Sequence, residues 1–121
     1  MVHHKLALNE LDDVLAKHDI VLIDFWAEWC GPCRMFGPIF EKASEKHTDI
    51  GFYKVNTEEN LEMAQAFGIQ SIPTLAIFRE GILLYKQPGA LPEAALADII
   101  GQVQALDMEK IKAEIEAQKA A

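Results

Sequence analysis

Cysteine, basic residues and long apolar stretches are all scarce in this sequence. The two cysteines, Cys30 and Cys33, are too few for a disulfide framework, and no histidine stands at ligand spacing from them to complete a zinc site. Lysine and arginine number 11 against 19 acidic residues, and the net charge of −8 repels a nucleic-acid backbone. The longest apolar stretch, residues 20–27, is short and is interrupted by Asp24, which argues against a membrane-spanning helix. We therefore expect no metal, nucleic-acid or membrane partner.

The composition is otherwise that of an ordinary globular protein. Of the 121 residues, 50% are hydrophobic and 25% are charged, and this length suits one domain built around one core. Residues 1–6 contain neither an apolar signal core nor a small-residue cleavage site, so we expect the protein to act in the cytoplasm, where it is made. In that reducing compartment two neighbouring cysteines are more often chemical than structural.

Strand-like and helix-like segments alternate along the first 106 residues. Runs rich in β-branched and aromatic residues predict strands over residues 4–7, 20–26, 50–56, 74–78 and 82–85. Helices are expected from a cap at Asn9 to His18, from Pro32 through an apolar face of Phe36, Ile39, Phe40 and Ala43, from Thr57 to Gly68, and from Pro92 through Leu96, Ile99, Val103 and Leu106. This order predicts an α/β fold: a central mixed sheet of four to five strands flanked by about four helices on both faces.

The segment Trp29-Cys30-Gly31-Pro32-Cys33 lies where the buried strand over residues 20–26 passes into a helix. Proline suits a first helical turn, which places Cys30 at the helix N-terminus, where unpaired amides and the helix dipole stabilise an anion. The pKa of the Cys30 thiol should therefore fall, which gives an exposed nucleophile at neutral pH. Cys33 lies one turn further in, is more shielded, and is suited to resolving an intermediate.

Other uses of this cysteine pair fit the sequence less well. Covalent haem attachment requires a histidine after Cys33, and Arg34 stands there instead. A purely structural bridge across two residues restrains very little of an unfolded chain. The position and context of the pair therefore favour redox chemistry.

Asp24 is the most informative residue outside the cysteine pair. A carboxylate within an apolar strand covered on both faces costs several kcal/mol unless its pKa rises or it finds a partner. Such groups are often functional. The alternative is an aspartate at an exposed strand edge, but the neighbours Ile23 and Phe25 favour the buried position.

The sequence closely resembles the thioredoxin family. The similarity is strongest over Asp24-Phe25-Trp26-Ala27-Glu28-Trp29-Cys30-Gly31-Pro32-Cys33-Arg34-Met35, and it continues at Lys54-Val55-Asn56, Ser71-Ile72-Pro73-Thr74-Leu75 and Gly89-Ala90. It covers residues 5–106 in collinear order, which indicates a thioredoxin domain over residues 1–106. The resemblance implies the thioredoxin fold and a protein-disulfide reductase, an electron carrier that uses the Cys30/Cys33 dithiol and needs no bound cofactor. It also implies thioredoxin reductase and disulfide-containing proteins as partners.

The resemblance also implies roles for individual residues. Asp24 accepts the proton of Cys33, and Lys54 is the matching cation, provided that the strands carrying them are adjacent. Ile72-Pro73 corresponds to the family's cis-proline loop, in which the backbone of Ile72 pairs with an extended substrate segment and Pro73 keeps metal ions from the sulfurs. A flat apolar docking surface around Cys30 comprises Trp29, Gly31, Pro32, Ile72, Gly89 and Ala90.

Two other functions are alternatives. Oxidases and isomerases of the same fold usually carry histidine between the cysteines, whereas this chain has Gly31-Pro32 there, and they work in an oxidising compartment. The second alternative belongs to a different class. In a non-catalytic binding or assembly subunit, the fold and the C-terminal tail would form a docking surface and the dithiol would be incidental.

Residues 107–121 extend beyond the length typical of the family. Asp107 is a good helix cap, with Leu106 and Ile111 at the staple positions around it, and Met108, Ile111 and Ile115 form an apolar stripe. We expect the helix to break at Asp107 and a separate amphipathic helix to fold back or meet a partner. A frayed, solvated extension is the alternative, because short isolated helices are marginal. We expect a monomer, with self-association through the tail left open.

Overall fold

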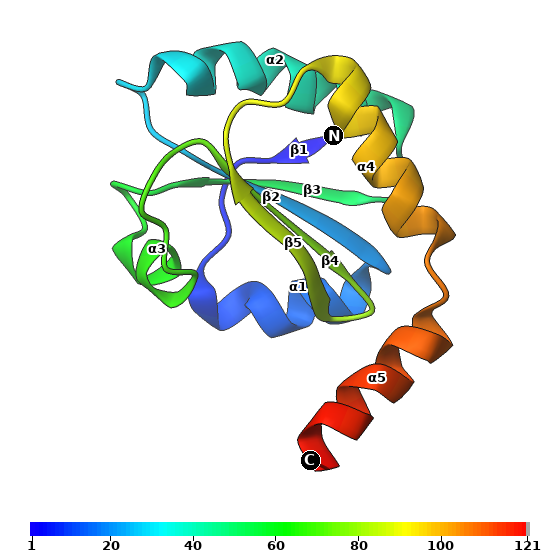
Figure 1. The fold of residues 1–121 in the computed structure, drawn as a ribbon. Coiled ribbons are helices and arrows are strands. Elements are labelled where there is room, and N and C mark those ends of the chain that lie inside the picture. Colours follow the sequence, from blue (N-terminus) through cyan, green and yellow to red (C-terminus); the bar gives the residue numbers. More distant parts are fainter. Residues whose placement is uncertain (121) are drawn as a thin grey trace.

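The computed structural model describes residues 1–120 and contains a five-stranded sheet (Figure 1). Its strands, in the order in which they lie side by side, are β1 (Val2–His3), β3 (Gly51–Asn56), β2 (Ile20–Trp26), β4 (Thr74–Arg79) and β5 (Ile82–Pro88). β1, β3 and β2 run parallel, whereas β4 is antiparallel to β2 and β5 is antiparallel to β4. The sheet is therefore mixed, with β2 at its centre.

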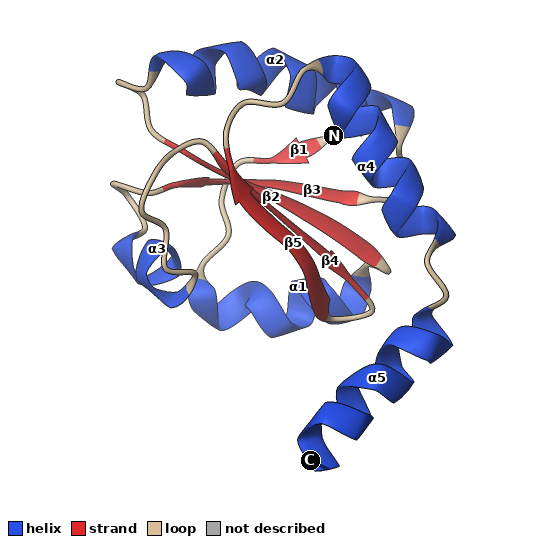
Figure 2. Ribbon diagram, in the orientation of Figure 1, coloured by secondary structure: helices blue, strands red, loops and turns tan. Residues whose placement is uncertain are grey.

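Helices cover both faces of this sheet (Figure 2). The helices α2 (Gly31–Lys46) and α4 (Glu93–Ala105) lie on one face, and α1 (Leu11–Lys17) and α3 (Leu61–Ala66) lie on the other. The last helix, α5 (Met108–Ala120), stands outside these layers. This arrangement confirms the predicted α/β architecture, and the tail forms the separate helix expected after Asp107. No helix within residues 1–120 is long and apolar enough to cross a membrane.

Two hydrophobic clusters fill the space between the sheet and its helices. On the side of α2 and α4, Leu22 packs in a cluster with Phe36 and Phe40, which confirms the predicted apolar face of α2. On the side of α1 and α3, Ile23 belongs to the second cluster. Successive residues of a strand point to opposite faces, so Asp24 shares the face of Leu22 and lies under α2 and α4.

The first strand and helix differ from the prediction. The strand is Val2–His3 rather than residues 4–7, because those two residues are the ones that pair with β3. Asn9 does not cap the helix, since it lies within a 3-10 turn over Leu8–Glu10. In that turn the Glu10 carboxylate accepts the Ala7 amide at 2.9 Å.

The helix α3 begins later than predicted. Thr57 was expected to open it, but the Asn56 side chain accepts the Glu58 amide at 2.9 Å and holds this segment in a turn. Asn60 is the cap, and its Oδ1 accepts the Met63 amide at 3.1 Å.

Two predicted turns are confirmed. Gly68, with φ of 60°, follows the end of α3, and the β4–β5 hairpin turns through Glu80 and Gly81, with φ of 52° and 77°. Positive φ at both central residues is the geometry of a two-residue hairpin. The second strand, β5, continues to Pro88 rather than ending at Tyr85.

The chain breaks between α4 and α5, as predicted. Leu106 leaves the helical conformation with ψ of 141°, and Asp107 Oδ1 accepts the Lys110 amide at 3.2 Å and so caps α5. Because the helix has already ended, Leu106 is 36% exposed, and the buried face of α4 contains Ile100 beside Leu96 and Val103. Residue 121, the end of the predicted 107–121 extension, lies outside the described residues.

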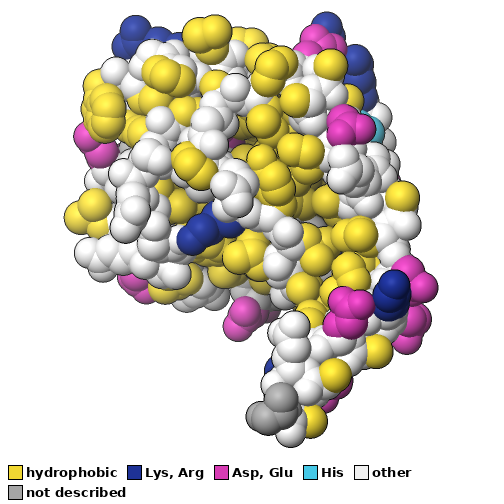
Figure 3. All heavy atoms as spheres, viewed as in Figure 1, with side chains coloured by type: hydrophobic (Ala, Val, Ile, Leu, Met, Phe, Trp, Pro, Cys, Tyr) yellow, Lys and Arg dark blue, Asp and Glu magenta, His cyan; other side chains and the backbone are white. Residues whose placement is uncertain are grey.

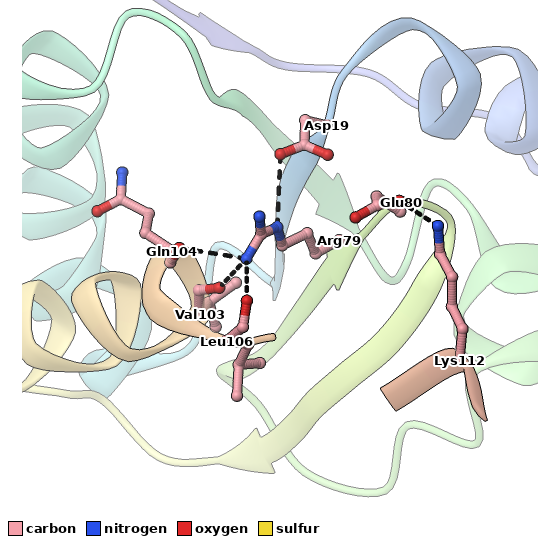
Figure 4. Close-up of polar contacts among 7 residues, drawn as sticks. All are labelled: Asp19, Arg79, Glu80, Val103, Gln104, Leu106 and Lys112. Carbon is pink, nitrogen blue, oxygen red and sulfur yellow. Dashed lines mark hydrogen bonds and ion pairs between the residues drawn. The ribbon is translucent and has the colours of Figure 1, made fainter. Parts of the chain in front are cut away.

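Arg79, at the end of β4, stabilises the break between α4 and α5, which we call the tail joint (Figure 4). Its Nη1 donates to the carbonyl oxygens of Val103, Gln104 and Leu106 at 2.8, 3.2 and 3.1 Å. Its Nε lies 3.5 Å from Asp19 Oδ2. The last carbonyls of a helix have no partner within the helix and attract a cation, so one guanidinium satisfies the end of α4.

The first turns of α5 contact the body of the protein. Met108 is 6% exposed, and Lys112 forms an ion pair with Glu80 of the hairpin turn (Figure 4). Ile111 and Ile115 are half-buried. The rest of α5 projects away from the sheet, as the space-filling view also shows (Figure 3).

Candidate functional site

The two cysteines lie at the junction between the central strand and the longest helix that packs on it. Cys30 is the N-cap of α2, and its Sγ accepts the Cys33 amide at 3.1 Å. Pro32 lies in the first turn of the helix, where its missing N–H leaves no bond unmade. The two cysteines form a disulfide with Cα atoms 5.3 Å apart. The predicted position of Cys30 at a helix N-terminus, where an anion is favoured, is therefore confirmed.

The expectation that Cys30 is exposed and Cys33 more shielded is wrong for this oxidised form. Both residues are buried, with 3% and 4% of their surfaces exposed. The loop before β4 covers the pair: Cys30 Sγ lies 3.7 Å from the Ile72 carbonyl oxygen. The Ile72-Pro73 peptide bond is cis, as the resemblance implies, and Pro73 is buried.

The predicted docking residues gather around this pair. Trp29 is 67% exposed, Gly31 and Pro32 are exposed at the start of α2, and Ile72 is half-buried. The surface is not flat here, because Trp29 and Ile72, together with Ile69, line a hollow of about 380 Å³.

The loop after β5 joins the same region. The Gly89 amide donates to the Pro73 carbonyl at 2.8 Å, with a φ of 115° that favours glycine. Ala90 is half-buried and packs against the core cluster under α2 and α4. Gly89 therefore lies beside the cis peptide, while Ala90 contributes to packing as well.

Asp24 lies at the centre of the sheet, with no surface exposed. It is opposite Lys54 on β3 and Leu75 on β4, so the exposed-edge alternative is wrong. Neither carboxylate oxygen has a hydrogen-bond partner among the described residues. Burial raises the pKa of Asp24 to about 7, and the positive charge of Lys54 lowers it by a smaller amount.

Lys54 occupies the parallel register position beside Asp24, which satisfies the condition set by the sequence. Its Nζ lies 4.5 Å from the centroid of the Trp26 ring. A cavity of about 470 Å³ is lined by Lys54, Trp26, Cys33 and Gly37, so it reaches one of the two sulfur-bearing residues. Within residues 1–120, no group of three or more histidine, cysteine, aspartate or glutamate side chains could hold a metal ion.

The sequence did not indicate a role for Glu58 or Gly37, which both lie in this region. Trp29 Nε1 donates to Glu58 Oε1 at 2.5 Å, although the two residues are 29 positions apart and no local spacing connects them. Gly37 lines the same cavity as Cys33, and the signal that was available is a glycine within a helix.

Comparison with known proteins gives a consistent result. The chain matches the thioredoxin family model over residues 2–102. A protein of Streptomyces coelicolor described as putative thioredoxin 2 is 53% identical over 116 residues, which cover 96% of this chain and 87% of the relative. A thioredoxin of Mycoplasma pneumoniae is 38% identical over 102 residues, covering 84% of this chain and 100% of the relative.

Solved structures agree. A mutant thioredoxin from Halobacterium salinarum has a TM-score of 0.79 at 38% identity, covering 87% of this chain and 92% of that chain. Oxidised thioredoxin from Plasmodium falciparum has a TM-score of 0.75 at 31% identity, covering 87% of this chain and 100% of that chain. A binding or assembly subunit without redox activity is not favoured by these relatives. This chain belongs to the thioredoxin family, and it is a protein-disulfide reductase whose redox-active pair is Cys30 and Cys33.

Proposed function

We propose that Cys30 attacks the disulfide bond of a protein substrate and that Cys33 completes the exchange. The Cys30 thiolate bonds to one substrate sulfur, the substrate disulfide breaks, and the second substrate sulfur leaves as a thiolate. The Cys33 thiolate then attacks Cys30 Sγ, which releases the reduced substrate and leaves the Cys30–Cys33 disulfide. One observation carries this order: Cys30 Sγ is the atom that accepts an amide at the N-terminus of α2.

Asp24 is proposed to accept the proton that Cys33 must lose. A carboxyl group with a pKa of about 7 exchanges protons readily at neutral pH, which suits a general base. Because Asp24 lies inside the sheet, we expect a water molecule to relay the proton from the sulfur. Lys54, beside it on β3, limits the rise of the Asp24 pKa and so favours the carboxylate.

The substrate is proposed to dock in extended form across the cis-proline loop. The Ile72 backbone would pair with the substrate as an added strand does, next to Pro73 and Gly89. Trp29 and the exposed Gly31-Pro32 turn would supply apolar contact on the other side of Cys30. This surface suits other proteins rather than small molecules.

Partners and location follow from the same chemistry. Both electrons reside in the dithiol, so we propose that no bound cofactor is needed and that a thioredoxin reductase restores the reduced form. The substrates are proteins that carry disulfide bonds. A reducing compartment, the cytoplasm, fits a reductase of this kind.

Reduction of insulin by dithiothreitol, with and without this protein, tests the proposal. The wild type should accelerate the reaction. The protein-dependent rate should be more than about a hundredfold lower for Cys30→Ser, because no attacking thiolate remains. Cys33→Ser should instead accumulate a mixed disulfide with the substrate. Equal rates for wild type and Cys30→Ser would contradict the proposal.

A further inference from the structure

Gly37 is buried in α2 at a position where its backbone does not need glycine. Its φ is not positive, unlike that of Gly68, Gly81 and Gly89. A glycine inside a helix destabilises it relative to alanine, because the backbone has more freedom to lose. The effect of a side chain here therefore depends on the space around position 37.

That space holds the end of one side chain. A Cβ atom built on Gly37 would lie 3.7 Å from Lys54 Nζ, and no other atom of the residues beyond its own helix neighbourhood would lie within 4 Å. Gly101, in α4, would meet nothing within 4 Å. Of these two helical glycines, Gly37 is the one that faces a charged group.

The neighbours of Lys54 show what its position does. On one side its Nζ lies 4.5 Å from the Trp26 ring centroid, a distance at which an ammonium is attracted to the ring. Along the sheet it stands beside Asp24, to which no cation within the described residues comes as close as 4.0 Å. The other charged side chains around the cavity are those of Glu28, Arg34 and Glu41.

We propose that Gly37 is a positioning residue: its missing side chain leaves the space in which the Lys54 ammonium lies against Trp26, beside the strand position of Asp24. The inference rests on the proton transfer proposed for Asp24 and Lys54. A side chain at position 37 would compete with the ammonium for this part of the cavity. A long one displaces the charge, and a methyl group, at an ordinary contact distance, leaves it in place.

The test measures the titration of Asp24 in the oxidised protein, where neither cysteine titrates. The carboxyl carbon chemical shift of Asp24, followed by NMR from pH 5 to pH 9, reports it directly. Lys54→Met removes the charge and should raise the pKa of Asp24 by about half a unit or more. Gly37→Leu should raise it by a similar amount, and Gly37→Ala should leave it near the wild-type value. The double variant Gly37→Leu/Lys54→Met should shift no further than Lys54→Met alone.

Controls separate positioning from helix stability. Gly37→Ala and Gly101→Leu both raise helix propensity, so they should raise the melting temperature without moving the Asp24 titration. If leucine at position 37 prevents folding, Gly37→Val takes its place.

Two results overturn the inference. One is a Gly37→Leu (or Gly37→Val) titration equal to that of the wild type while Lys54→Met shifts, and the other is a Lys54→Met titration that does not shift. Neither touches the order of attack by the cysteines, which the insulin assay tests separately.

Discussion

The two ends of β4 differ in how the buried charged groups beside them are paired. At its end, Arg79 places one guanidinium on three carbonyl oxygens and keeps Asp19 beside it. At its start, Thr74 follows the cis-proline loop over the dithiol, where the Asp24 carboxylate on the neighbouring strand has no hydrogen-bond partner among the described residues. At the end, the Arg79 guanidinium meets carbonyl oxygens and an opposite charge, and its Nε alone has no hydrogen-bond partner among residues 1–120. At the start, both oxygens of a buried acid lack such a partner. The comparison indicates that the tail joint favours stability, whereas the dithiol end gives up stability for a group that titrates near neutrality.

The sharpest way to break this comparison is Asp24→Asn. In the native protein the pKa of Asp24 is about 7, and in the unfolded chain it returns to 3.8. Between pH 3.8 and pH 7 the native protein therefore binds more protons than the unfolded chain, so the free energy of unfolding falls as the pH rises through this range. The fall amounts to about 4 kcal/mol between pH 4 and pH 8. Asp24→Asn should remove this fall and be the more stable protein at pH 8, with little difference at pH 4.

Urea unfolding of both oxidised proteins from pH 4 to pH 8 measures the effect. Parallel stability curves for wild type and Asp24→Asn would show that the carboxylate is not penalised by burial. The same variant should also resolve the mixed disulfide more slowly at pH 7, by about tenfold or more, because Cys33 loses its proton acceptor. Single-turnover release of substrate measures that rate.

The opposite end should respond in the opposite direction. Arg79→Met keeps much of the apolar stem but removes the guanidinium, leaving carbonyls at the end of α4 and Asp19 without their partner. We expect a loss of about 3 kcal/mol in the free energy of unfolding. Insulin reduction under native conditions should stay within about twofold of the wild type, because the dithiol lies at the other end of β4.

Lys86→Met is the matched control for this variant. Its ammonium donates to one helix-end carbonyl, that of Phe67, at 2.7 Å, rather than to three. It should therefore cost less than Arg79→Met. An equal loss in the two variants would mean that the multiple contacts of Arg79 add nothing.

Sequence periodicity predicted the buried parts of the fold better than the ends of its elements. β2 was placed at Ile20–Trp26, as observed, because apolar β-branched residues fill it and both faces are buried. The starts of α1 and α3 were misplaced, because several residues compete as caps. Asn9, Thr57 and Asn60 are all plausible caps in sequence, and only the contacts of the folded chain select Asn60. Likewise, the exposure of Cys30 depends on a loop more than 40 residues away, which no local pattern reports.

The site divides in the same way. Cys30, Cys33 and Asp24 were identified from residue type and position, a cysteine pair where a strand meets a helix and a charge inside an apolar run. Lys54, Ile72-Pro73 and Gly89-Ala90 were identified through the family resemblance. Glu58 and Gly37 were missed because their roles depend on distant partners, Trp29 and Lys54. Arg79 was missed for the same reason: a lone arginine before a turn gives no sign that its side chain will bond to the last carbonyls of a helix 24 residues later.

The smallest expected effect concerns α5 itself. Its first turn is held by the Asp107 cap and the burial of Met108, whereas the residues after Ile115 are exposed. Hydrogen exchange should therefore show protection that falls along the helix, from the amides near Lys112 to those near Gln118. Asp107→Ala removes the cap and should cost α5 about 1 kcal/mol, which is about a fivefold loss of protection confined to this helix.

The control is Asp98→Ala, which removes an exposed aspartate of α4 that accepts a bond from the Gln102 side chain and caps nothing. It should leave protection in α5 unchanged, and neither variant should alter insulin reduction. If the wild-type amides of residues 108–118 already exchange as fast as those of an unfolded chain, then the ordered structure ends at the tail joint, before α5. In that case the tail is the frayed extension that the sequence left open.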